Sequence, residues 1–152
     1  MIFAIDPGTT KSAWVMLDGS LKPMRFGISP NEDLLADIGA VPSEYDFVIE
    51  MIASYGMAVG KEVFETCVWI GRFFEAAYGM RSRNRIYRID EKMNLCHSAQ
   101  AKDANIRQAL IDRFGDVGTK RKPGWFYGVS KDVWAAIAVG VTWHDRHGGA
   151  GK

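Results

Sequence analysis

Two apolar segments of this sequence each end on a carboxylate, and this feature limits most strongly the folds that the chain can adopt. Residues 1–6 read Met-Ile-Phe-Ala-Ile-Asp, and residues 45–50 read Tyr-Asp-Phe-Val-Ile-Glu. Short apolar runs of this length are typical of buried strands. A carboxylate that leaves a buried strand needs a partner, because its charge is costly to remove from water. We therefore expect Asp6 and Glu50 at one edge of a sheet, where the carboxyl ends of parallel strands meet and ligands tend to bind.

The rest of the pattern predicts a mixed sheet with helices. Turns at Pro7-Gly8 and Asp18-Gly19 separate the first three expected strands, which therefore form a meander. The expected order is strands at 1–6, 12–17 and 22–28, a helix at 30–38, a strand at 45–50, a helix at 61–78, a strand at 85–89, and helices at 103–114 and 130–144, the last one capped by Ser130. This order predicts an α/β fold with five strands and helices on both faces of the sheet.

Length and composition predict a single folded domain. The 152 residues can bury one core, and 47% hydrophobic with 24% charged residues is ordinary for a globular protein. No apolar run approaches the roughly 20 residues of a membrane span. The first residues contain no basic leader or cleavage site, so we expect a cytoplasmic protein. We expect the domain to cover residues 1–147 and a frayed tail to cover residues 148–152.

Basic residues are concentrated in two parts of the chain, although the net charge is only +1. One group lies between Arg81 and Lys92, and the other is a loop bounded by Gly and Pro residues. Clustered Lys and Arg side chains are typical of surfaces that contact phosphates, and two solvated surfaces are the alternative. The residues expected to contact DNA in these groups are Arg85, Arg88, Lys92, Lys120, Arg121 and Lys122.

A third acid, Asp132, lies at the start of the last expected helix. If that helix docks with its first turn at the sheet edge, its carboxylate converges with those of Asp6 and Glu50. Converging like charges repel, and oxygen ligands of this kind suit Mg²⁺, which can activate water for phosphodiester hydrolysis. Each acid also has a simpler explanation, since Asp6 can start a turn and Asp132 can complement a helix dipole.

The helix expected at residues 61–78 is apolar on more than one side. A helix of this kind can pack on a sheet and on a partner subunit at the same time. We expect Phe64 and Val68 to lie at such a subunit interface.

Four segments resemble, in order, the RuvC-type Holliday junction resolvases. Residues 4–8, Ala-Ile-Asp-Pro-Gly, resemble the opening of that family, and residues 48–50 stand where the family has its second acid. Lys92 with residues 99–106 resembles the family's basic segment, and residues 132–142 resemble its closing helix. The resemblance covers nearly the whole chain.

This resemblance implies a ribonuclease H-like fold and a homodimeric nuclease that resolves four-way DNA junctions, each subunit cutting one strand. It implies that Asp6, Glu50 and Asp132 are catalytic ligands of Mg²⁺, and we expect Mn²⁺ to support activity as well. Lys102 would contact DNA, and Tyr55 could stack on bases opened at the crossover. So compact a chain resembles a phage or prophage version, which would act in the cytoplasm of a bacterial host.

Two departures keep alternatives open. The family's closing motif has two ligand positions three residues apart, and Ala135 occupies the second here, so a catalytically weak or dead junction-binding protein is one alternative. Asp103 puts an acid where the family tends to be basic. Residues 6–11, Asp-Pro-Gly-Thr-Thr-Lys, also resemble the first phosphate loop of actin-like and sugar-kinase ATPases, which need a second lobe to enclose nucleotide.

Overall fold

A mixed sheet of five strands, in the order β3-β2-β1-β4-β5, runs through the centre of the computed structural model, which describes residues 1–148. The strands are β1 (Ile2–Asp6), β2 (Lys11–Leu17), β3 (Pro23–Pro30), β4 (Asp46–Met51) and β5 (Ser82–Tyr87). The first three form an antiparallel meander, while β4 pairs parallel to β1 and β5 pairs parallel to β4. The predicted meander and mixed five-stranded sheet are confirmed.

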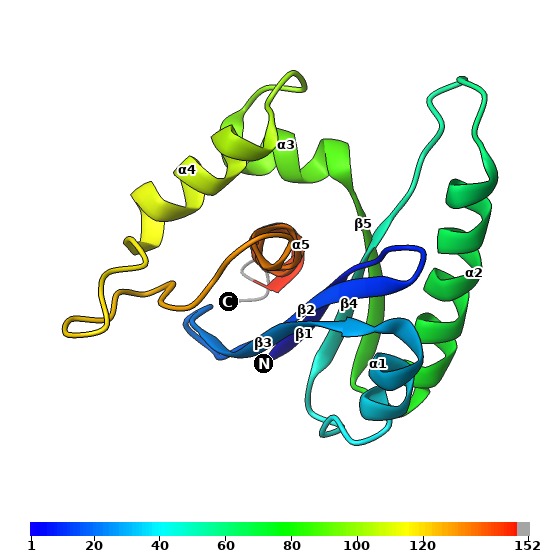
Figure 1. Cartoon of the computed structure of the whole chain (residues 1–152), viewed down its shortest axis with the longest axis horizontal. Coiled ribbons are helices and arrows are strands. Elements are labelled where there is room, and N and C mark those ends of the chain that lie inside the picture. The colour runs from blue at the N-terminus through cyan, green and yellow to red at the C-terminus, as the bar shows by residue number, and fades with distance from the viewer. Residues whose placement is uncertain (149–152) are drawn as a thin grey trace.

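Helices cover both faces of this sheet, as predicted (Figure 1). One face carries α1 (Asn31–Ile38) and α2 (Lys61–Ala76), which continues into a short 3-10 turn, η1 (Ala77–Gly79). The other side carries α3 (Arg88–Cys96), α4 (Asp103–Phe114) and α5 (Val133–Trp143), which continues into η2 (His144–Gly148). Among the helices of residues 1–148, none has the length and apolarity of a membrane span.

Alternation along the central strands explains why their sequences are almost continuously apolar. Ile2, Ala4 and Val48 pack in the core on the α5 side. Phe3 and Phe47 pack in the core on the side of α1 and α2. Strands buried on both faces need apolar residues at every position, which leaves the terminal carboxylates as the exceptions.

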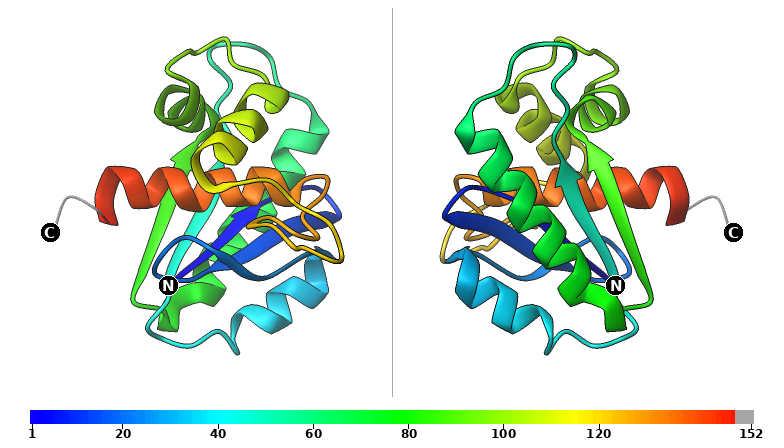
Figure 2. Two further views of the ribbon diagram at one scale, coloured as in Figure 1. Left: turned by 90° about the vertical axis from the view of Figure 1, so that its left-hand side faces the viewer. Right: turned by 90° about the vertical axis from the view of Figure 1, so that its right-hand side faces the viewer.

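Close contact holds α5 against the sheet. Nearly all of its residues are buried, and a Cβ atom at Gly140 would lie 2.7 Å from Leu17 Cδ1. The absence of a side chain at Gly140 therefore lets α5 pack closely against the strands. Figure 2 shows α5 lying across them. This docking decides where the first turn of α5, with Asp132, is held.

Several predicted boundaries were wrong, and two of them affect the site. The strand expected to run to residue 89 ends at Tyr87, and α3 begins at Arg88 because the Asp90 carboxylate accepts a hydrogen bond from Tyr87 N at 3.1 Å. Ser130 does not cap α5, which begins at Val133 without a side-chain cap. Of the predicted tail, residues 149–152 lie outside the described residues.

Candidate functional site

Parallel pairing brings the first two predicted acids to one edge of the sheet. Ile5 of β1 is paired with Ile49 of β4, so Asp6 and Glu50 follow neighbouring positions. Asp132 stands directly before α5, and its negative charge acts on Asp6 together with that of Glu50. The structure thus places Asp6 and Glu50 at one edge of the sheet and Asp132 within electrostatic reach of Asp6.

The surroundings of Asp6 oppose the ionisation of its carboxyl group. Burial, followed by repulsion from Glu50 and Asp132, raises the pKa of Asp6 from its ordinary 3.8 to about 8. Hydrogen bonding to Glu50 adds to this shift. Arg88 acts in the opposite direction and lowers the pKa.

A fourth carboxylate, which was not predicted from the sequence, belongs to the same cluster. The Glu91 side chain is 0% exposed. Burial raises the pKa of Glu91 well above its ordinary range, and hydrogen bonding to Glu50 with repulsion from it raises it further. Had residues 88–96 been interpreted as a helix, Glu91 would have shared a face with Leu95, and an acid on an apolar face is a recognisable signal.

Arg88 is the cation of this cluster. Its Nη1 lies 3.2 Å from Glu91 Oε1 and 3.7 Å from Glu50 Oε1, and its Nη2 bonds to the Asp103 carboxylate. The Arg88 side chain is only 28% exposed, so the residue expected on a basic DNA-binding surface is held among acids.

The cluster is chemically suited to a hard divalent cation. Within residues 1–148, Glu50 Oε1 and Glu91 Oε2 are buried without a hydrogen-bond donor. Buried carboxylate oxygens without donors need a cation, and an all-oxygen set suits Mg²⁺. Across the same residues, however, no three His, Cys, Asp or Glu side chains already stand in the spacing of metal ligands. The donor atoms therefore suit the ion, and the acids would have to draw together to bind it.

Hydrogen bonds fix the loop that follows Asp6. Gly8 N donates to Ser12 Oγ at 3.1 Å, Ser12 Oγ donates to Asn31 Oδ1 at 2.6 Å, and Asn31 Nδ2 donates to Gly8 O at 2.9 Å. A Cβ atom at Gly8 would lie 2.3 Å from Lys11 O, so the turn requires glycine. Ser12 and Asn31 were not predicted from the sequence, where their only signal is a polar residue at the start of a strand and of a helix.

Ala135 lies beside the acids. A small pocket of about 60 Å³ is lined by Asp132, Ala135 and Arg88, among others. Positions three apart on a helix share one side, so residue 135 faces the same space as Asp132. Among the described residues that line this pocket, α5 contributes no second carboxylate.

The predicted DNA contacts lie on different surfaces. Arg85 is part of β5, where it lies opposite Ile49 of β4. Its guanidinium lies 5.7 Å from the ring centre of Phe74, on the α2 side of the sheet. Arg88, in contrast, begins α3 among the acids. The basic stretch of the sequence therefore does not form one continuous surface.

The remaining predicted contacts are mostly exposed. Tyr55 is 66% exposed, in the loop between β4 and α2, where its φ angle is 52°. Lys92 is half-buried on α3, and Lys102 is exposed just before α4. Lys120, Arg121 and Lys122 are exposed in a loop that is closed by a hydrogen bond from Thr119 N to Lys122 O.

The two residues predicted at a subunit interface are exposed on α2. Phe64 and Val68 are 61% and 62% exposed, and their spacing places them on one side of the helix. Ile70 and Phe73, in contrast, are buried against the sheet.

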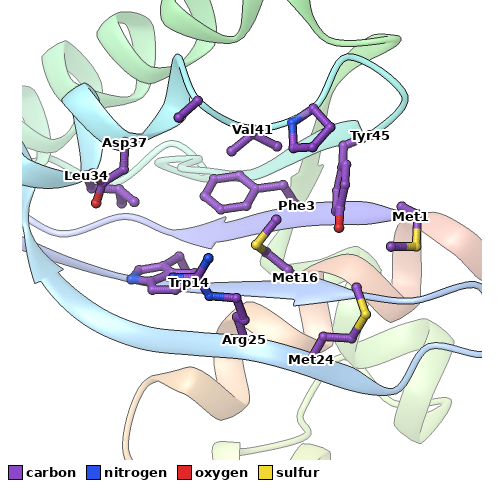
Figure 3. A pocket seen from close by; sticks show the side chains of 12 residues that line it. Met1, Phe3, Trp14, Met16, Met24, Arg25, Leu34, Asp37, Val41 and Tyr45 are labelled. Carbon is purple, nitrogen blue, oxygen red and sulfur yellow. The ribbon is translucent and has the colours of Figure 1, made fainter.

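A separate pocket lies away from the acid cluster. It encloses about 620 Å³ near the start of β1, on the α1 side, between Phe3, Trp14 and Tyr45 (Figure 3). Of the described residues that line it, only Arg25 and Asp37 are charged, so it lacks the converging acids. The candidate site is therefore the acid cluster at the other end of the sheet, and this pocket is not part of it.

Comparison with known proteins identifies the class of fold. No family model matches the sequence, and no curated protein is similar to it in sequence. The sheet order with helices on both faces is that of a ribonuclease H-like α/β fold.

Two solved structures specify the fold further. RuvC from T. thermophilus in complex with a Holliday junction substrate superposes with a TM-score of 0.64 and 14% identity, over 99% of this chain and 95% of that one. A second structure, of Thermus thermophilus RuvC, superposes with a TM-score of 0.63 and 17% identity, over 97% of this chain and 96% of that one. The chain has the RuvC fold over nearly its whole length.

Proposed function

We propose that this chain is a metal-dependent endonuclease that cuts four-way DNA junctions. The observation that carries the proposal is that Asp6 and Glu50 end neighbouring parallel strands at one edge of the sheet, with Asp132 at the start of α5 near enough for its charge to repel that of Asp6. Its support is the same fold in RuvC, one structure of which is bound to a Holliday junction substrate.

The proposed ligands of the metal are Asp6, Glu50 and Asp132. Mg²⁺, or Mn²⁺ on the same oxygens, would supply an activated water and stabilise the leaving oxygen in phosphodiester hydrolysis. The chain itself contributes negative charge that is held in place. Repulsion between buried carboxylates opposes their ionisation, so a cation that relieves it is bound with more favourable energy. The hydrogen-bonded loop of Gly8, Ser12 and Asn31 keeps Asp6 at the edge of the sheet.

DNA is proposed to lie across the side of the sheet that carries α3 and α4. Lys92 and Lys102 would contact backbone phosphates there, and the exposed loop at Lys120–Lys122 would extend this contact. Tyr55, exposed after the strand that carries Glu50, would stack on an unpaired base at the crossover. Arg88 would have to leave its acidic partners to reach a phosphate.

A homodimer is part of the proposal, because paired incisions need two sites. A second copy is proposed to cover Phe64 and Val68, the exposed apolar pair on α2. Isologous pairing of this face would place both acid clusters in one particle.

Cleavage of defined DNA structures tests the proposal. Purified protein is incubated with a labelled four-way junction, a matched duplex and a flap, with Mg²⁺ or Mn²⁺. We expect symmetric nicks in the junction alone, abolished in Asp6→Asn and retained in Asp33→Asn, which alters an exposed acid of α1. If the protein cuts the duplex and the flap as well as the junction, the proposed junction resolvase would instead be a general nuclease.

A second candidate is a junction-binding protein with little or no catalysis. Ala135 favours it, because α5 presents one carboxylate to the site where two are expected from the family resemblance. Tight and selective junction binding without nicks, in either metal ion, would support this candidate. The ATPase alternative has less support, because residues 1–148 form one lobe around one sheet.

A further inference from the structure

We propose that Glu91 is a fourth metal ligand, which α3 supplies in place of the carboxylate that α5 lacks at position 135. This inference deepens the proposed function and rests on it. It concerns a residue that neither the strand pattern nor the family resemblance indicates.

The first observation is the state of the Glu91 side chain. It is 0% exposed, and its Oε1 contacts Arg88 Nη1 at 3.2 Å, but its Oε2 is buried without any donor from residues 1–148. Buried acids are normally paired through both oxygens, since an uncompensated charge is costly. Glu91 therefore has one oxygen in excess of what the described part of the protein satisfies.

The second observation is where that side chain lies. Arg88 Nη1 contacts the carboxylates of both Glu91 and Glu50, so the two acids lie side by side, and Glu50 Oε1 is likewise buried without a hydrogen-bond donor from the described residues. This proximity follows from the topology. β5 pairs with β4 so that Ile86 lies opposite Glu50, and α3 starts two residues after Ile86. The first turn of α3 is therefore held over the end of β4.

The third observation is that a cation already bridges these two acids. Arg88 Nη1 lies 3.2 Å from Glu91 and 3.7 Å from Glu50. On the α5 side, the Ala135 methyl group lines a small pocket beside Asp132 and Arg88, and it contributes no charge. A divalent ion that entered between Asp6 and Glu50 would thus find its additional carboxylate on α3 and not on α5.

The competing explanation is that Glu91 only holds Arg88 in place. The two roles differ in what happens when Arg88 is removed. If Glu91 is a metal ligand, its mutation weakens metal binding even when Arg88 has been removed. If Glu91 only holds Arg88 in place, its mutation has no further effect once Arg88 is gone. A double-mutant cycle of the two residues therefore separates the two roles.

The experiment is a calorimetric titration of the full-length protein with Mn²⁺ and with Mg²⁺, without DNA. Glu91→Gln is measured alone and in the Arg88→Ala background, with Asp6→Asn as the reference for a missing ligand and Asp103→Asn as the matched control for a missing partner of Arg88. We expect Glu91→Gln to weaken metal binding by at least about tenfold, both alone and in the Arg88→Ala background. Residues that only hydrogen-bond to a metal ligand already contribute about this much, and a direct ligand should contribute no less. The metal affinity of Asp103→Asn should stay within about twofold of the wild-type value, well below the effect of losing a residue that supports a metal ligand.

Rescue gives a second readout. Adding Ala135→Asp to Glu91→Gln should restore most of the affinity, because residue 135 faces the same space. If Glu91→Gln does not fold, as judged by circular dichroism, Glu91→Asp keeps the charge on a shorter side chain and should weaken binding to a smaller extent.

The outcomes distinguish this inference from the proposed function. Unchanged affinity in Glu91→Gln with abolished affinity in Asp6→Asn overturns the role of Glu91 alone. A loss that disappears in the Arg88→Ala background also overturns it and makes Glu91 an anchor for Arg88. Unchanged affinity in Asp6→Asn overturns the proposed metal site itself.

Discussion

Asp6 shows how a single residue can carry a conflict between stability and function. Its carboxylate ends an apolar strand, and burial with repulsion from Glu50 and Asp132 raises its pKa to about 8. Without a bound cation, the ionised form is therefore unfavourable in the folded protein. A site that must hold a cation has to tolerate this cost when the cation is absent.

We predict that Asp6→Asn abolishes cleavage, leaves junction binding intact, and stabilises the metal-free protein by about 1–2 kcal/mol at pH 8. The native Asp6 keeps a proton up to about pH 8 that the unfolded chain releases near the ordinary value of 3.8, so wild-type stability falls as the pH rises between these values. The gain should therefore be smaller at pH 5 and should vanish below about pH 3.8. Denaturant unfolding of both proteins in chelator at the two pH values measures this. An equal destabilisation at both would contradict the assignment of Asp6 as a buried, repelled acid.

At the scale of elements, ion pairs and hydrogen bonds fix where the parallel strands begin. Asp46 opens β4 and accepts hydrogen bonds from Arg81 Nε at 3.0 Å and from Ser82 Oγ at 2.6 Å, at the start of β5. The β4–β5 register depends on this contact, and the same register places α3 over the end of β4. The far end of the sheet therefore contributes to the geometry of the acids.

We predict that Asp46→Asn lowers stability by about 1–2 kcal/mol at pH 7, as expected for hydrogen bonds to a charged group with a partly solvated partner. Burial raises the pKa of Asp46, but the hydrogen bonds from Arg81 and Ser82 outweigh it and hold the pKa below its ordinary 3.8. The stabilisation is therefore present above pH 3.8 and is lost as the pH falls through the lower native value. Thermal unfolding at pH 7 and in strong acid checks this, with the exposed neighbour Glu44→Gln as the control. A difference that persists undiminished in acid would mean that the carboxylate charge is not involved.

The second element-scale prediction concerns α2. Phe64→Glu or Val68→Glu should yield monomers, because either change introduces a charge into the apolar pair proposed to meet its copy. Met24→Glu, on the edge strand β3, also replaces an exposed apolar residue and should leave the oligomeric state unchanged. Sedimentation velocity at micromolar concentration measures both. A monomeric wild type, with and without DNA, would refute the proposed dimer.

At the scale of the whole molecule, the acids of the candidate site and the exposed basic residues proposed to bind DNA lie on different segments, although the net charge is only +1. Acids are concentrated at the carboxyl edge of the sheet, with Arg88 among them. Exposed basic residues stand on other segments, before α4 and in the loop at 120–122. The exposed basic residues can thus attract DNA, while the acids of the candidate site remain free to bind a cation.

We predict that replacing Lys120, Arg121 and Lys122 with Ala weakens junction and duplex binding alike. The slope of log affinity against log salt concentration should fall by roughly one for each phosphate that these side chains no longer neutralise. Lys61→Ala, an exposed residue at the start of α2, is the matched control. Fluorescence anisotropy between low and moderate salt measures the slope, and an unchanged slope would leave the loop as a solvated surface.

Much of the fold could be predicted from the sequence, because the signals are local. The alternation of apolar residues and turns defined the meander, and an acid at the end of each buried strand indicated the edge where Asp6 and Glu50 meet. The start of α4 at Asp103 also followed from its periodicity. Such features depend on a few neighbouring residues, which any fold of this chain must satisfy.

What only the tertiary structure decided is which distant groups share the cluster. Arg88 belongs to a basic stretch in the sequence, yet it contacts acids because α3 turns at the end of β5. Glu91 is an ordinary charged residue in the sequence, yet it is fully buried beside Glu50. Neither position follows from spacing along the chain, because both depend on the parallel pairing of β4 with β5 and on where α3 folds back. Electrostatic energy depends on distance in space, so the charges of this site acquired their partners only when the sheet was assembled.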